Sequence, residues 1–164
     1  MALILSGDTG VPASGMPTGS VIQTVQATYS TATTVTSTTY TDIGLSATIT
    51  PISSTSKILI YTSVCADIGR SVAGGIGGGI SIVRNSTTVW APNPNGSSQP
   101  YTWYISSGVE LTQMMNLYYL DSPATTSAIT YKIQGALYTT NNSSTVSFQA
   151  GNTPSNIILM EIKA

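Results

Sequence analysis

The first residues that could do chemistry are Asp8, Thr9 and Gly10, which match the core of the aspartic-protease active site. That chemistry needs two carboxylates that share one proton in a buried pair. The chain contains the motif once, so a protease would have to be a homodimer with Asp8 on a rigid, buried loop. Because Asp8 lies in a stretch rich in glycine and proline, we expect a turn residue instead.

Further along the chain, Asp67, Glu110 and Asp121 are candidates for the carboxylate pair of a polysaccharide-degrading enzyme, but their spacing does not predict a pair. The chain has no histidine and one cysteine, and it lacks the Asp-x-Asp spacing of a calcium loop. The glycine cluster Gly74 to Gly79 lacks the Lys-Ser/Thr of a phosphate-binding loop. We therefore expect no enzyme, no cofactor and no metal ion, although an ion held by several copies on a symmetry axis stays open.

A loop rich in proline and asparagine, residues 91–100, is flanked by aromatic residues. Aromatic rings beside amide side chains can stack on sugars and hydrogen-bond their hydroxyls, so this region is a candidate receptor or glycan site. The alternatives are that Trp90 and Trp103 fill the core, or that the loop contacts a neighbouring subunit. The candidate site residues are Trp90, Asn93, Asn95, Gln99, Tyr101, Trp103 and Tyr104.

The composition excludes several partners. Only 7% of the residues are charged and the net charge is −1, so no basic patch for nucleic acid is expected. No apolar run approaches the roughly 20 residues that span a bilayer, so no membrane insertion is expected. The apolar start MALIL has no Lys or Arg before it and is too short for a signal-peptide core, so no secretion signal is expected. Near-zero charge gives little self-repulsion, which suits a chain that associates with its own copies.

The elements that would position these residues are strands. From Lys57, the residues Ile58, Ile60, Val64 and Ala66 share one face, and both faces are largely apolar or small. This pattern predicts a central strand covered on both sides, with Cys65 as a small buried residue rather than a nucleophile.

The rest of the chain alternates with period two. We predict strands at 21–26, 28–41 (exposed), 47–50, 101–105, 127–138, 145–150 and 156–163. We also predict a hairpin that turns at 85–87, and we expect the strand 145–150 to pair with the strand before it. Residues 109–121 fit a strand with Leu111, Met115, Leu117 and Tyr119 toward the core, and a helix is the competing interpretation. The glycines of 74–79 predict a flexible loop or a close approach of a neighbouring backbone. We therefore predict a Gly/Pro-rich arm, residues 1–20, followed by one all-β domain, residues 21–164. The predicted fold of this domain is an antiparallel β-sandwich of jelly-roll type.

Residues 19–66 resemble a module of tailed-phage fibre and head-fibre proteins. The resemblance lies in GSVIQ-VQ (from Gly19), TDIGLSATITP (Thr41 to Pro51) and SKILI (Ser56 to Ile60), and NIILMEIKA resembles the closing strand of such chains. It is specific over the first 65 or so residues and loose from Gly69 to Thr153.

The resemblance implies a virion surface protein, a homotrimer of β-sandwich subunits that contacts other virion proteins. The arm would attach it to the capsid or tail through Leu3, Ile4, Leu5 and Val11. Two functions follow: a fibre subunit that binds a host-surface glycan or protein, or a capsid decoration (cement) protein with no receptor role.

Overall fold

The strand β4, Lys57–Gly69, lies at the centre of the larger of two sheets in the computed structural model. The structure describes residues 12–69, 74–92, 102–105, 110–140 and 144–164. On one side β4 pairs with β11 (Ser155–Ile162) and β10 (Thr145–Phe148), and on the other with β8 (Glu110–Asp121). The predicted central strand is confirmed.

The larger sheet, called sheet A, is completed at its edges by β1 (Val21–Tyr29), which pairs with β11, and by β2 (Thr33–Val35), which pairs with β10. The smaller sheet, called sheet B, has the order β3-β9-β5-β6, with β7 also on β5. Its strands are β3 (Thr41–Ile49), β5 (Gly74–Arg84), β6 (Thr87–Trp90), β7 (Thr102–Ile105) and β9 (Ile129–Leu137). Every recorded strand pair is antiparallel.

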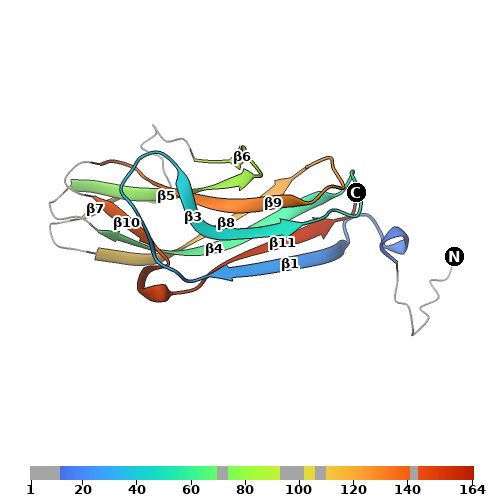
Figure 1. Ribbon diagram of the computed structural model, residues 1–164, viewed down its shortest axis with the longest axis horizontal. Helices are drawn as coiled ribbons and strands as arrows, with labels where there is room; N and C mark the ends of the chain where they lie inside the picture. The colour runs from blue at the N-terminus through green and yellow to red at the C-terminus, as the bar shows by residue number, and fades with distance from the viewer. Residues whose placement is uncertain (1–11, 70–73, 93–101, 106–109, 141–143) are drawn as a thin grey trace.

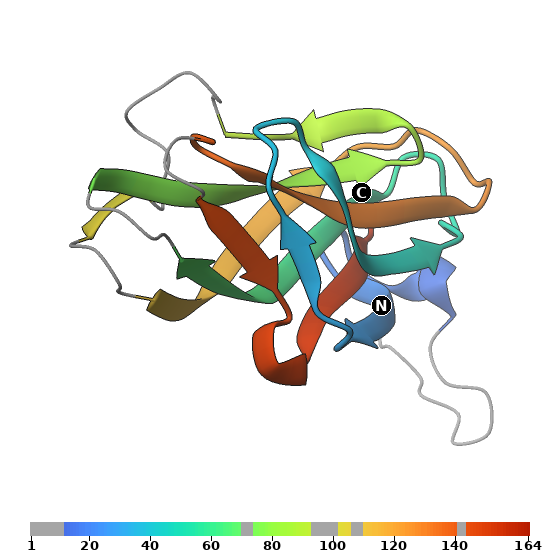
Figure 2. The same cartoon turned by 60° about the vertical axis from the view of Figure 1, so that its left-hand side comes forward.

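The two sheets pack face to face, as Figures 1 and 2 show. The core between them comes from the inward parity of each strand, and the all-β antiparallel sandwich is confirmed. Fully buried side chains of the core include Ile43, Leu45, Ile58, Ile60, Ile82, Met115, Tyr131, Ile133 and Phe148.

Several local predictions are confirmed. Residues 110–121 form a strand rather than a helix, with Met115 fully buried, and Ile129, Tyr131, Ile133 and Leu137 face the core. Cys65 is buried and free. Among the described residues, no helix is long and apolar enough to cross a membrane.

Other boundaries were wrong. Residues 28–41 are not one strand, because only Thr33–Val35 forms β2 and Thr41 already begins β3. β10 does not pair back on β9, because the chain crosses to sheet A and β10 pairs with β4 and β2. One 3-10 turn, η1 (Ala13–Gly15), interrupts the arm, and another, η3 (Ala150–Asn152), follows β10.

The glycine cluster forms a strand rather than a flexible loop. Gly74 to Arg84 make β5, which pairs with β9 from Gly78 onward. A Cβ on Gly78 would lie 3.3 Å from the backbone oxygen of Ala136 and 3.4 Å from Val146 Cγ2. The alternative reading of the cluster, a close approach of a neighbouring backbone, therefore holds at Gly78.

Candidate assembly surface

Of the candidate acidic residues, Asp121 and Asp67 lie far apart in the fold. Asp121 Oδ2 accepts hydrogen bonds from Arg84 (2.7 Å) and from the Tyr131 hydroxyl (2.6 Å). Burial, reinforced by Asp121, raises the pKa of Tyr131 far above its ordinary value, so the phenol stays a donor. Asp121 of β8 lies opposite Ile58 of β4. Asp67 lies nine residues after Ile58 on β4, so at strand spacing it is about 30 Å from Asp121. Glycosidase carboxylates lie within roughly 10 Å of each other.

The third acidic candidate, Glu110, is placed by its backbone alone, opposite Gly69. Asp8 lies outside the described residues. In the part of the chain that the structure describes, no cluster of three or more acidic, Cys or His residues could hold a metal ion.

The predicted aromatic loop is described only in part. Trp90, at the end of β6, is half-buried and packs against the core, which agrees with the alternative given for it above. Trp103 and Tyr104 lie in β7, whose backbone pairs with Ile76 and Gly75 of β5. The residues Asn93, Asn95, Gln99 and Tyr101, and the arm residues Leu3, Ile4, Leu5 and Val11, lie outside the described residues.

The outer face of sheet A carries an apolar surface. The register aligns Leu120, Leu59 and Met160 in one row across β8, β4 and β11, and Tyr118, Tyr61 and Ile158 in the next. We call these six residues the outer patch. None of them is buried in the single chain; Tyr118 is 77% exposed, Leu120 47% and Tyr61 37%.

The exposed outer patch shows that the prediction of a β4 covered on both faces was wrong in part, and the patch itself was not predicted. The second face of β4 is covered only toward its end, where Ser63 and Cys65 are buried, whereas Tyr61 is exposed. The sequence feature that could have indicated the patch is that residues 110–121, like β4, carry apolar side chains on both faces of the strand. Which strand lies beside β4 could not be read from that pattern.

The outer face of sheet B is polar by contrast. Thr48 and Thr130 form a hydroxyl–hydroxyl hydrogen bond of 2.7 Å across β3 and β9. Asp42 accepts from Lys132 Nζ (2.8 Å) and from Gln134 Nε2 (2.6 Å), and these hydrogen bonds lower the pKa of its carboxyl. The two outer faces thus differ in chemistry, and it is sheet A that presents apolar area to a partner.

Among the described residues, charged side chains are paired or lie at the margin of the outer patch. Arg84 pairs with Asp121 and Lys132 with Asp42. On β4 itself the charges are at the ends, Lys57 at the start and Asp67 near the end, where it accepts from Thr112. Covering the six residues of the outer patch therefore separates neither of these ion pairs, and Lys57, two residues before Leu59 on the same face, lies at the margin of the patch.

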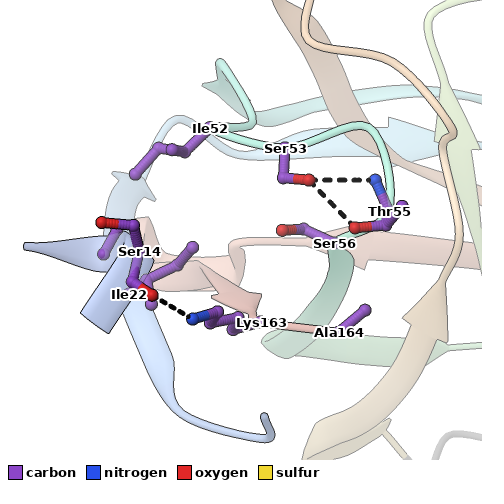
Figure 3. Close-up of a pocket in the computed structure, with 9 residues that line it drawn as sticks. Ser14, Ile22, Ile52, Ser53, Thr55, Ser56, Lys163 and Ala164 are labelled. Atoms are coloured by element: carbon purple, nitrogen blue, oxygen red, sulfur yellow. Dashed lines mark hydrogen bonds between the residues drawn. The ribbon is translucent and has the colours of Figure 1, made fainter. Parts of the chain in front are cut away.

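The arm is fastened at one end of the sandwich, near the C-terminal strand. The Lys163 ammonium donates to the carbonyls of Ser14 (2.8 Å) and Met16, so it caps the carbonyl end of η1 (Figure 3). The Lys163 backbone also bonds to Gly19 and Ser20. A pocket of about 300 Å³ opens beside this contact, lined by Ala13, Ser14, Ile22, Ile52, Ser53, Thr55, Ser56, Lys163 and Ala164.

The buried carboxylate of Glu161 holds the turn between β3 and β4, whose residues Ile52 and Ser53 line this pocket. It accepts from the backbone N–H of Ile52 (2.9 Å) and Ser53 (3.3 Å) and from the Gln23 side chain. Burial by itself raises the pKa of Glu161, but the hydrogen bonds from Gln23 and from the turn outweigh it, so the pKa is lowered. The group therefore remains an anion held by neutral donors.

Comparisons with known proteins give a general likeness only. No protein-family model and no curated protein matches the chain. The chain is similar to a structure of infectious bursal disease virus Gt strain (15% identity, TM-score 0.41, 99% of this chain and 47% of the other). It is also similar to the T13 IBDV viral particle (14%, 0.44, 100% and 40%) and to latent PorU from Porphyromonas gingivalis (9%, 0.42, 91% and 14%).

The chain spans less than half the length of these solved structures. At TM-scores below 0.5, the likenesses do not identify what this chain does.

Proposed function

We propose that the chain is a non-enzymatic structural subunit of a phage virion surface, a fibre or head-fibre protein that assembles as a homotrimer. The observation that carries this proposal is the outer patch: an uncharged apolar surface on sheet A, set against a polar outer face on sheet B. Exposed apolar area of this kind favours burial between subunits. The resemblance of residues 19–66 to phage fibre modules supports the virion setting.

The placement of the two ends supports a division of roles. η1 and Ala164 lie at one end of the sandwich, and β7 lies at the other (Figure 1). We propose that residues 1–20 attach the subunit to the capsid or tail at the first end. A host-surface glycan or protein would then be bound at the far end, near β7.

The absence of catalysis is part of the proposal. Asp121 is already committed to Arg84 and Tyr131, and Asp67 to Thr112. The two donors on Asp121 favour its charged form, which supports a structural role for this carboxylate.

Native mass spectrometry of the full chain, followed by a glycan array with the assembled protein, tests the proposal. We expect a trimer that binds one class of glycan. A trimer that binds no glycan and no host-cell surface would favour the capsid decoration protein. A monomer at every concentration would overturn both functions.

A further inference from the structure

β8 has a hydrogen-bonded neighbour on one side only. It pairs with β4 without a register shift from Ile58–Asp121 to Gly69–Glu110, while β11 and β10 occupy the other side of β4. Among the strands that the structure describes, none pairs with the outer edge of β8. β8 is therefore a 12-residue edge strand without a bulge.

β8 lacks the devices that protect an edge strand from pairing with another chain. From Leu111 to Leu120 it contains no proline and no charged residue. The other described edge strands each have such a feature. β1 and β3 are interrupted by register shifts, and β3 also carries the charged Asp42. β2, β6 and β7 are short, with three, four and four residues. β8 is the long, unprotected edge of the described part of the fold.

We propose that β8 pairs antiparallel with β8 of a second copy, so that sheet A continues across a twofold axis. Two identical strands without interior charge approach each other without repulsion. Pairing centred on Asn116, near the middle of β8, gives the longest overlap. It brings Met114 of one copy beside Tyr118 of the other on the outer face, a favourable sulfur–aromatic contact.

The size of this contact defines its role. An overlap of about 11 residues at ~3.4 Å each, through a sheet ~10 Å thick, buries on the order of 400 Å² per copy. A stable dimer buries roughly 800 Å² per copy, so β8 pairing is weak by itself. The inference therefore rests on the proposed function, in which the outer patch already holds subunits together. Because a strand paired with itself closes at two copies, the contact joins two trimers.

Cysteine cross-linking along β8 tests the contact directly. Cys65 lies opposite Met114, so the scan uses a Cys65→Ala background to prevent an internal disulfide. Single cysteines replace Thr112, Met114, Asn116 and Tyr118, which share the outer face. Thr24→Cys on β1 and Thr48→Cys on sheet B are matched controls, because both side chains are exposed.

We expect the yield of disulfide-linked dimer to be highest for N116C and about tenfold above that of both controls. The reason is that a disulfide forms only where the two Cα atoms lie within about 7 Å. Native mass spectrometry at high concentration should show hexamers, two trimers joined through β8, beside the trimer. Hydrogen exchange of the unmodified chain should show protection of residues 110–121 that increases with concentration.

A trimer without cross-links or protection in β8 would overturn the β8 contact and leave the proposed function standing. A dimer cross-linked through β8 would support the contact and overturn the trimer. A monomer at every concentration would overturn both proposals.

Discussion

Tyr61 of β4 lies directly opposite Tyr118 of β8, and both rings are on the outer face of sheet A. Next to them, Leu59 lies opposite Leu120. Cross-strand aromatic and aliphatic pairs usually stabilise a sheet from its buried side, whereas these pairs face outward. A partner that covers them would gain apolar burial without separating any ion pair.

Replacing Tyr118 and Leu120 by serine should weaken self-association by at least about tenfold, because truncating two exposed apolar side chains at an interface removes more than about 1.4 kcal/mol. The folded subunit should keep its stability, since both side chains are exposed. Sedimentation velocity over a concentration series measures the effect. Ile52→Ser is the matched control, because Ile52 is exposed but lies away from the outer patch. Equal association of both variants and the unmodified chain would contradict the prediction.

Gly135→Ala should destabilise the fold by about 1–3 kcal/mol, because inserting a methyl group here forces the core to move. A Cβ at Gly135 would lie 2.1 Å from Phe148 Cε2, and Phe148 is fully buried. Gly78→Ala, with its nearest contact at 3.3 Å, is the control and should cost less. Urea unfolding measures both. Phe148→Leu should make Gly135→Ala less costly, and no such coupling would show that the clash is relieved elsewhere.

Tyr131→Phe should cost about 1–2 kcal/mol, since it removes a buried hydrogen bond to Asp121. Asp121→Ala should cost more, because it leaves both the Tyr131 hydroxyl and the Arg84 guanidinium without their shared acceptor. Thermal unfolding monitored by circular dichroism compares the two variants. A milder effect of Asp121→Ala than of Tyr131→Phe would contradict the described network.

Glu161 should make stability depend on pH in the acid range. Its folded-state pKa is lowered from 4.5, so its contribution is present above about pH 4.5 and is lost as the pH falls through the lower folded value. Stability measured by urea unfolding between about pH 3 and 6 should therefore fall toward acid, and Glu161→Gln should flatten that slope. Asp42→Asn is the control, because its carboxyl is exposed and should matter less. An unchanged slope in Glu161→Gln would exclude this role.

Lys163→Met should loosen the arm without unfolding the sandwich. The ammonium holds the carbonyls of Ser14 and Met16, whereas the backbone bonds of residue 163 to Gly19 and Ser20 remain. Hydrogen exchange at residues 13–16 should rise while that of β4 stays the same. Unchanged exchange at η1 would show that the side chain does not fasten the arm.

Period-two alternation of side chains predicted the strands that have at least one uninterrupted apolar face. β4 and β9 were recognised because their inward residues recur without interruption over whole strands. The hairpin predicted to turn at 85–87 is confirmed, since the end of β5 pairs with β6. The glycine-rich start of β5 was not predicted as a strand because glycine disfavours strands intrinsically, and the closeness of Ala136 and Val146 makes glycine suitable at Gly78.

The surface features depend on contacts between distant parts of the chain. Glu161 binds the turn at Ile52, 109 residues earlier, and Lys163 binds Ser14, 149 residues earlier. The outer patch needs β8 to lie beside β4 in one register. Local patterning carries no information on such pairings.

Hydroxyl-radical footprinting of the full chain at high and low concentration tests most directly whether copies of the chain cover the outer patch. We predict that oxidation of Tyr118 and Leu120 falls several-fold as the protein assembles, while oxidation of the exposed Ile52 stays constant. Equal oxidation of Tyr118 at all concentrations would contradict the account.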